Sequence, residues 1–420
     1  MERAKILFIT SFYSALMVSI ESGKWQPTGM PGIAKLFEGL NGRVPFEVVL
    51  IDKSGRYPHS SQIKVNFDEI DATFHVFTSF QSYSWFTRNP ILNKLRRLVD
   101  AILHFRRLYS IIKESNVNLL YADRENVVTG ALLAVLLKKE VILRIHGVNV
   151  FYDRFSDFFL RLRYPIRYLS FKAPFKYIIC SEDGTPGKEF LSRFTSTKVP
   201  KSILLNGVEK SARALIDVRT KYQIPESVPI ILFVGRLEGG KGVEIFIQSL
   251  KKLNRINPNF YAIVVGGGQL YNSLRLQAKG YGNFIFTNSM KHDDVHSFYK
   301  AADIYVSLNS LGNLSNTVLE ALQEGNCIVT YGGDRYSRRD QSTEKYLKDA
   351  AIFIDRYKVL DELPNKLNEL LCSPGKRRQM KNKAKKQANK ILKTWDQRIN
   401  EEIGIIKSVI SRDPSINLST

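Results

Sequence analysis

Cysteine is scarce in this sequence, and its three copies are Cys180, Cys327 and Cys372. They are odd in number and far apart, and none belongs to a C-x-x-C pair or to a Cys/His cluster of zinc-site spacing. The scarcity excludes a disulfide scaffold, and the spacing excludes the usual structural zinc sites. We therefore expect a reduced, cytoplasmic protein.

Long apolar runs are also lacking. The run 127–137 stops at Lys138 and Lys139, short of the roughly 20 residues that a membrane-spanning helix needs. Near the start, the mostly apolar stretch 6–20 follows two cations and imitates an export signal. It contains Thr10 and Ser11, however, and no small-residue cleavage site follows it. We expect a buried first β-strand there in preference to a signal peptide or an anchor.

Acidic residues are outnumbered by basic ones. The chain has 62 Lys and Arg against 40 Asp and Glu, which gives a formal net charge of +22 at pH 7. Such an excess predicts an anionic partner, which can be nucleic acid, an acidic membrane surface or a phosphorylated ligand. Three segments hold 22 of the 62 cations, and these are residues 77–113, 153–176 and 376–393.

The first two basic segments contain aromatic residues throughout. Cations interleaved with aromatics on amphipathic stretches are typical of surfaces that bind an anionic membrane. They equally fit helices whose aromatics pack inward and whose cations are solvated, and we favour that interpretation for residues 376–393. No known nucleic-acid-binding motif is visible, so nucleic acid is the least favoured partner.

Short β-branched or aromatic runs alternate with longer helical patterns along the chain. This alternation predicts parallel strands joined by helices, that is, doubly wound α/β sheets. The 44% hydrophobic content supplies the cores and excludes a disordered chain. The candidate strands fall into two series, 5–10, 46–52, 73–77, 117–121, 141–146, 176–181 and 202–206, then 230–234, 261–265, 284–286, 304–308, 327–331 and 351–354.

A polar, weakly patterned stretch separates the two series and divides the chain. We expect a Rossmann-like domain over residues 1–208, a hinge over 209–228 and a second Rossmann-like domain over 229–395. Residues 396–420 are expected to form a helix that packs back on the first domain, followed by a polar tail. Since open α/β sheets bind ligands at the carboxyl ends of their strands, both domains should present their sites to an interdomain cleft.

The first chemically informative motif runs from the 230–234 strand through a glycine-rich loop into a helix. Gly235 allows a ligand to approach the backbone, Arg236 offers a planar fork for phosphate oxygens, and Lys241 adds a charge near the helix start. Alternatively, the two cations are solvated residues of an ordinary turn.

The second motif is a short helix between Ser315 or Asn316, good N-caps, and Gly325, a good C-cap. Its free backbone N–H groups and its dipole favour an anion such as a diphosphate. Glu320, one turn in, can accept hydrogen bonds from two ribose hydroxyls, although a solvated helix position is the usual fate of a glutamate.

Residues 229 onward resemble the nucleotide-sugar-binding domain of a glycosyltransferase of family 4, which has the GT-B fold of two Rossmann-like domains. The resemblance is diffuse in the first half of the chain. The carrying motifs are Phe233-Val-Gly-Arg-Leu with Lys241-Gly242, Val264-Val-Gly-Gly-Gly268, Ala302-Asp303, Asn316-Thr-Val-Leu-Glu320-Ala-Leu with Gly325, Leu204-Leu-Asn-Gly-Val208, Ser181-Glu182 and Ile145-His146-Gly147.

The resemblance implies a retaining hexosyltransferase that uses a nucleoside diphosphate sugar and no essential metal. It implies that Gly235, Arg236 and Lys241 hold the diphosphate and that Glu320 binds the ribose. The helix start at Ser315, Asn316 and Thr317 would bind the distal phosphate, and His146 would act at the donor sugar near the reacting carbon. Gly29 and Gly32 are the counterparts of the family's glycine-rich loop. From the residues alone, His146 can also be structural, and the two glycines can be an ordinary turn.

The sequence departs from the family at one acidic position. The family carries an acid eight residues before the ribose-binding glutamate, and here that position is Gly312. Asn309 or Asn313 can offer hydrogen bonds to sugar hydroxyls in its place. Thr287 and Asn288 also stand where a glycine is common, which points to an uncommon donor.

Four functions follow from these observations. The leading one is a glycosyltransferase whose acceptor is a glycan or a lipid-linked sugar, working at the inner face of an anionic membrane in polysaccharide or glycoconjugate assembly. A nucleotide-sugar epimerase or hydrolase of the same fold is the alternative among enzymes. A non-catalytic adaptor that lost the acid at Gly312 is an alternative from another class, although the presence of Arg236, Lys241 and Glu320 disfavours it. A nucleic-acid-binding protein is the weakest candidate.

Overall fold

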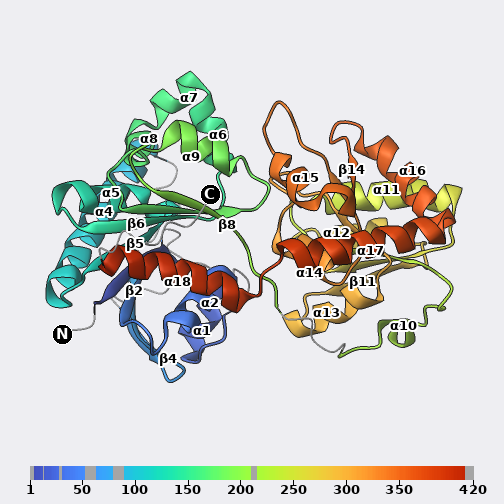
Figure 1. Ribbon diagram of the computed structural model, residues 1–420, viewed down its shortest axis with the longest axis horizontal. Coiled ribbons are helices and arrows are strands. Elements are labelled where there is room, and N and C mark those ends of the chain that lie inside the picture. Colours follow the sequence, from blue (N-terminus) through green and yellow to red (C-terminus); the bar gives the residue numbers. More distant parts are fainter. Residues whose placement is uncertain are drawn as a thin grey trace. The chain divides into compact units, whose positions relative to one another are not determined.

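Figure 1 shows the computed structural model of the chain, which describes residues 4–12, 14–27, 31–52, 63–78, 89–209 and 215–411. The chain forms two compact units. Unit 1 comprises Met1–Ser181, Lys188–Leu204 and Asp396–Thr420, and unit 2 comprises Glu182–Gly187 and Leu205–Trp395. Both units contain a wholly or mostly parallel sheet covered by helices, as the sequence predicts.

Unit 1 is built on an eight-stranded sheet of order β3-β4-β2-β1-β5-β6-β7-β8. The pairings from β4 through β7 are parallel, and β3 alone among the registered pairs runs antiparallel, against β4. β2 and β5 are buried along their whole length and β1 along all but its last residue, which confirms the expected buried first strand. The strands are β1 Ile6–Ser11, β2 Phe46–Asp52, β3 Ile63–Phe67, β4 Ile70–Thr78, β5 Leu119–Asp123, β6 Glu140–Ile145, β7 Tyr177–Glu182 and β8 Lys201–Leu205.

Helices cover both faces of this sheet because successive β1 side chains point to opposite sides. Leu7 and Ile9 pack toward the face covered by α4 Pro90–Glu114, η1 Arg124–Asn126, α5 Val127–Leu136, α6 Asn149–Ser156, α8 Pro165–Ser170 and α9 Gly187–Phe194. Between α6 and α8, the short helix α7 Phe158–Arg163 buries no residue. Phe8 packs on Phe37 and Tyr121 on the other face, with ring centroids 5.1 and 4.8 Å away. That face carries α1 Ser14–Ser22, α2 Pro31–Leu40 and α18 Trp395–Ser411 (Figure 1).

Unit 2 is built on a six-stranded parallel sheet of order β11-β10-β9-β12-β13-β14. The chain leaves β9 toward β10 on one side and returns to β12 on the other. The strand order therefore reverses between β9 and β12, and open sheets of this kind bind ligands at the carboxyl ends of such strands. The strands are β9 Ile230–Val234, β10 Tyr261–Val265, β11 Phe284–Asn288, β12 Ile304–Ser307, β13 Cys327–Tyr331 and β14 Ala351–Ile354.

Two apolar clusters fill the faces of the unit 2 sheet. One lies under α11 Val243–Ile256, α12 Tyr271–Gln277 and α16 Val359–Cys372. The other lies under α13 His292–Ala301, α14 Asn316–Gln323, α15 Gln341–Leu347, η2 Lys348–Ala350 and α17 Pro374–Ile391. The short helix α10 Val218–Lys221, within the stretch expected to be a hinge, buries Val218 in this second cluster and belongs to unit 2.

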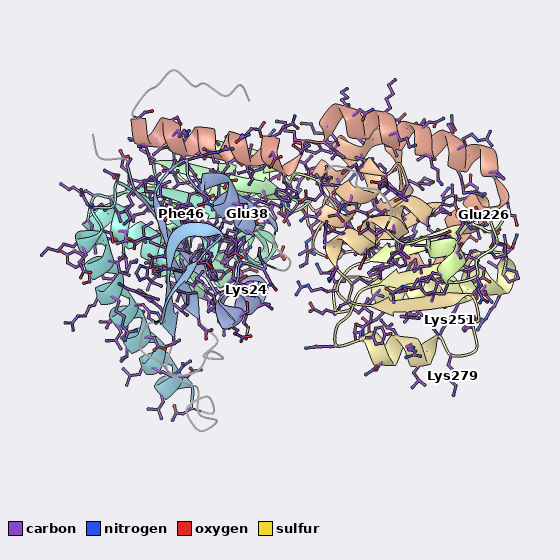
Figure 2. The ribbon with its side chains drawn as sticks, turned by 90° about the horizontal axis from the view of Figure 1, so that it is seen from below. Lys24, Glu38, Phe46, Glu226, Lys251 and Lys279 are labelled. Carbon is purple, nitrogen blue, oxygen red and sulfur yellow. The ribbon has the colours of Figure 1, made fainter. Side chains whose placement is uncertain are left out.

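The basic segment 376–393 lies mainly in helix α17. The buried side of α17 consists of the small or flexible side chains Met380, Ala384 and Ala388. Most of the cations of the segment lie at the surface. Figure 2 draws the side chains on the ribbon and labels Lys279, an exposed residue at the edge of unit 2. Among the described residues, no helix combines the length and the hydropathy that a membrane span requires.

Candidate functional site

The loop that follows β9 is locked against the loop that follows β12. Gly242 caps the start of α11 with φ of +78°, and a Cβ there would lie 2.2 Å from the carbonyl oxygen of Leu308, so only glycine fits. The Ser310 N–H also donates to the Gly240 carbonyl at 2.8 Å. These contacts bring Arg236 and Lys241 to the carboxyl edge of the sheet, beside the loop that leads to α14.

Arg236 and Lys241 differ in their surroundings. The Arg236 side chain is 70% exposed, and its guanidinium lies 3.3 Å from the carboxylate of Glu238. Lys241 is half-buried, and burial, with the positive charge of Arg236, lowers its pKa, against the opposing charges of Glu238 and Asp183. An ammonium with a lowered pKa gains from any bound anion, because the anion restores the favoured charged state.

The N-terminus of α14 offers backbone donors. Ser315 is the N-cap, but its side chain makes no capping bond, and its hydroxyl lies 3.0 Å from that of Thr317. The Asn316 amide oxygen instead accepts from the Asn206 side chain at 2.7 Å. The first N–H groups of the helix thus lack a side-chain cap, and the end of such a helix binds anions.

Glu320 is held by a histidine from the preceding helix. Its carboxylate is largely buried and accepts from Nε2 of His292, at the start of α13, at 3.0 Å. This hydrogen bond raises the pKa of His292, whose side chain is 53% exposed. A ribose that binds Glu320 would therefore displace or join His292, a residue that no sequence pattern connects to the site.

The loops after β10 and β11 complete this edge of unit 2. Gly266 and Asn288 form an isolated bridge, and Asn288 adopts φ of +65°. Asparagine is among the few residues other than glycine that tolerate this left-handed conformation. Asn288 therefore keeps the backbone conformation that a glycine would provide.

Asn313 does not have the sugar-binding role that we considered for it. It is completely buried, and its amide oxygen accepts from the hydroxyl of Ser307 at 2.8 Å and from the N–H of Asn309 at 2.9 Å. Its amide nitrogen donates to Asp340 and to the Asn309 carbonyl. Both polar atoms of the Asn313 amide are thus used within the protein, so Asn313 shapes the loop and ties it to the start of α15.

His146 lies in unit 1, directly after β6. Its Nε2 is inaccessible to solvent and has no hydrogen-bond partner among the described residues. Burial, with the positive charge of Arg144 two residues earlier, holds its pKa well below the ordinary value. The ring is therefore neutral and suited to hydrogen bonding with a hydroxyl rather than to electrostatic attraction of a phosphate.

A buried ionic cluster anchors the strand that carries His146. Glu402 of α18 accepts from Arg144 Nε at 3.1 Å, from Arg398 Nη2 at 2.6 Å and from the hydroxyl of Tyr121. Both arginines and the glutamate are 3% exposed or less in their side chains. The C-terminal helix α18 is thus joined to β5 and β6 through the centre of unit 1.

Gly29 and Gly32 were both expected in a glycine-rich loop, and the structure describes only Gly32. Gly29 lies outside the described residues. Gly32, expected in a loop, is the second residue of helix α2, because the helix begins at Pro31, a residue favoured in the first turn.

Residues 216–387 match the sequence family described as "Glycosyl transferases group 1". They form a domain of that family. The chain is 21% identical over 248 residues to the alpha-monoglucosyldiacylglycerol synthase of Streptococcus pneumoniae, covering 54% of this chain and 55% of that protein. The chain therefore spans about half the length of this curated relative.

Solved structures share the GT-B fold with this chain. Sucrose-phosphate synthase from Thermosynechococcus elongatus superposes with a TM-score of 0.70 at 13% identity, covering 98% of this chain and 100% of that one. HepE of Anabaena, in complex with UDP, superposes with a TM-score of 0.66 at 15% identity, covering 96% and 99%. The predicted family and the predicted α/β fold of two parallel sheets are confirmed.

The glycosyl transferases group 1 domain therefore gathers Gly235, Arg236, Lys241 and the start of α14 at one edge of its sheet. Glu320 follows one turn into α14. Two further residues were not found from the sequence, His292 on Glu320 and Asp183 near Lys241. Asn206 lies in a motif that carries the resemblance, but its contact with Asn316 was not predicted. Within the described ranges, no group of three or more His, Cys, Asp or Glu side chains could hold a metal ion.

Nucleotide affinity should depend on pH through His292. Protonated His292 pairs with Glu320, and this pairing is lost as pH rises through the raised pKa of His292. If ribose needs Glu320, affinity should increase about two- to fivefold between roughly pH 6 and 8, since a half-exposed ion pair is weak. Calorimetric titration of wild type and His292→Gln measures this, and the difference in affinity between the two proteins should narrow as pH rises from 6 to 8. A wild-type affinity that falls over this range would show that protonated His292 binds the ligand itself.

Proposed function

We propose that the protein is a retaining glycosyltransferase of the hexosyltransferase type. It moves a sugar from a nucleoside diphosphate sugar to an acceptor hydroxyl. The observation that carries the proposal is the uncapped start of α14 beside Lys241 and Arg236, with Glu320 one turn further on. The family match over residues 216–387 supports it, because the same residues lie within the matched range.

The proposed chemistry uses these groups to stabilise a departing diphosphate. Negative charge accumulates on the diphosphate as the bond to the sugar breaks. Fixed cations and backbone N–H groups stabilise that charge more strongly in the transition state than in the ground state. Arg236 and Lys241 supply the positive charge, and the first N–H groups of α14 bind the distal phosphate. Glu320 fixes the nucleoside by accepting from the ribose hydroxyls.

His146 is proposed to contact the donor sugar. Its side chain is neutral and partly exposed, so the ring can exchange a hydrogen bond with a sugar hydroxyl near the reacting carbon. A neutral imidazole also leaves the charge of the diphosphate to Arg236 and Lys241. The cluster of Arg144, Glu402 and Arg398 positions the end of β6 from which His146 projects.

Thermal-shift screening against nucleoside diphosphates and their sugars tests the proposed function. UDP and UDP-sugars come first, because HepE binds UDP. A donor at about a hundredfold excess over its dissociation constant should stabilise unit 2 by roughly 2.7 kcal/mol. The proposal fails if no nucleotide shifts the unfolding temperature, or if Arg236→Ala and Lys241→Ala respond as the wild type does.

The acceptor is proposed to be a glycan or lipid-linked sugar at an anionic membrane surface. An apolar patch on unit 1 supports this partner. It comprises the exposed side chains of three neighbouring helices, Leu132, Val135 and Leu136 of α5, Phe158, Phe159 and Leu162 of α7, and Ile166 and Leu169 of α8. Phe159 is 79% exposed, far more than a packed aromatic residue.

Cations border the apolar patch. Arg163 and Lys138 are exposed, and Arg161 and Lys172 both lie over the ring of Tyr168, at 5.2 and 5.0 Å from its centroid. Apolar side chains rimmed by cations fit a bilayer surface in which acyl chains lie below anionic headgroups, with about 1 kcal/mol per cation near the surface. The 153–176 segment is thus the best-supported of the three basic segments for this role.

Charge placed in the apolar patch should abolish membrane binding. The double variant Phe159→Glu and Leu162→Glu is expected to lose nearly all co-sedimentation with vesicles containing anionic lipid. The wild type should pellet with anionic vesicles and much less with neutral ones. Leu276→Glu, a change at a 70% exposed leucine of unit 2, is the matched control and should behave as wild type. Equal pelleting of all proteins with both vesicle types would refute the membrane surface.

A further inference from the structure

A segment from the first half of the sequence is built into unit 2. Residues Glu182–Gly187 group with unit 2, although Glu182 is the last residue of β7 in the unit 1 sheet. The Leu314 N–H donates to the Asp183 carbonyl at 3.2 Å, and the Asp340 N–H donates to the Gly184 carbonyl at 2.8 Å. The Ser342 hydroxyl donates to the Glu182 carboxylate at 2.7 Å. Three hydrogen bonds therefore hold this segment, one on the loop that leads into α14 and two on the start of α15.

The segment occupies the space that a side chain at Gly312 would need. A Cβ at this position would lie 2.6 Å from the Asp183 carbonyl oxygen and 2.9 Å from the carbonyl carbon of Gly184. Both contacts are to backbone, which cannot give way cheaply. Gly312 is therefore glycine because the Asp183 backbone crosses over it, and the loop before α14 cannot present a carboxylate from that position.

Asp183 carries a carboxylate on the segment that crosses Gly312. It is half-exposed, while the other residues of Glu182–Gly187 are buried. Its Oδ1 accepts from the Thr185 N–H at 3.0 Å, which fixes the turn. Its negative charge also acts on Lys241 and opposes the lowering of the Lys241 pKa. A negative charge thus stands beside the candidate diphosphate site, on the loop next to α14.

We propose that Asp183 binds hydroxyl groups of the donor sugar, in the place that Gly312 leaves without a side chain. A carboxylate accepts hydrogen bonds from neighbouring hydroxyls and repels phosphate. It therefore favours the sugar end of a donor over the diphosphate end at this position. The diphosphate lies on Lys241 and the α14 N–H groups, and the sugar lies toward Asp183. This inference rests on the proposed function, and it makes Asp183 a residue for sugar specificity rather than for nucleotide affinity.

Comparing a nucleoside diphosphate with its sugar tests this inference. Asp183→Asn keeps an oxygen that can accept from the Thr185 N–H and removes the charge. By calorimetry, its dissociation constant for UDP should stay within about twofold of wild type. Its dissociation constant for the UDP-sugar that wild type binds best should rise at least tenfold. Asp361→Asn, at an 85% exposed carboxylate of unit 2, is the matched control and should change neither constant.

The outcomes separate this inference from the proposed function. Equal weakening of UDP and of the UDP-sugar in Asp183→Asn would show a structural role for the loop and overturn the assignment, as would unchanged binding of both. An unfolding temperature equal to wild type, with the sugar-dependent affinity lost, would support it. A wild type that binds neither UDP nor any other nucleoside diphosphate overturns the proposed function, and the inference falls with it.

Discussion

Replacing Glu402 with alanine is expected to destabilise unit 1 by about 3–5 kcal/mol. The change leaves Arg144 and Arg398 buried without their shared counter-charge, and removing one partner of a buried ionic cluster carries a cost of this size. Denaturant unfolding followed by circular dichroism measures the effect. Lys407→Ala, at an exposed position of the same helix, is the control and should change stability by less than about 0.5 kcal/mol.

The same cluster should make unit 1 sensitive to acid. Its two arginines hold the pKa of Glu402 at about 2, below the ordinary value of 4.5. Glu47 also has a pKa of about 2, through hydrogen bonds from His75, Lys5 and Ser115. Depressed carboxyl pKa values stabilise the fold above pH 4.5, and this stability is lost as pH falls from about 4.5 to 2. Glu402→Gln should flatten that part of the profile, and a wild-type acid profile equal to that of the variant would contradict the buried ion pair.

Replacing Lys241 with alanine is expected to lower kcat/KM by about 100-fold or more. Lys241 is the half-buried cation of the candidate diphosphate site, and losing one such contact to a developing negative charge costs roughly 2.7–4 kcal/mol. Release of nucleoside diphosphate from the donor, followed in a coupled assay, measures the loss. Lys279→Ala is the matched control, because Lys279 is exposed at the edge of unit 2 (Figure 2).

The form of the loss distinguishes two roles for Lys241. A lower kcat with little change in KM would show that the ammonium acts mainly on the departing diphosphate. A higher KM with an unchanged kcat would show that it only holds the donor. Activity of Lys241→Ala within threefold of wild type would remove this residue from the site.

The strands of both sheets could be predicted from the sequence because parallel strands buried on both faces form continuous apolar runs. Ile230–Val234 and Cys327–Tyr331 are examples, and their predicted bounds match the structure. The strand Ile63–Phe67 was missed. It is a short antiparallel edge strand with the exposed polar residues Lys64 and Asn66, and such a run resembles a loop.

The motif residues of the candidate site were also predictable, because Arg236, Lys241 and Glu320 lie in local patterns next to strands and helix caps. His292 and Asp183 were not. His292 contacts a residue 28 positions away, and Asp183 accepts from the backbone of Leu314 in the other half of the chain. Contacts of this kind depend on how distant segments pack, and no periodicity or capping pattern encodes them.

A crystal structure of the protein with bound UDP tests the candidate donor site most directly. The account predicts diphosphate oxygens within hydrogen-bonding distance of Lys241 Nζ and of the backbone N–H groups at Asn316 and Thr317. It also predicts ribose hydroxyls on Glu320, with the contact between His292 and Glu320 broken or shared. UDP bound elsewhere on the protein, or bound with the ribose away from Glu320 and the α14 N-terminus unoccupied, would contradict it.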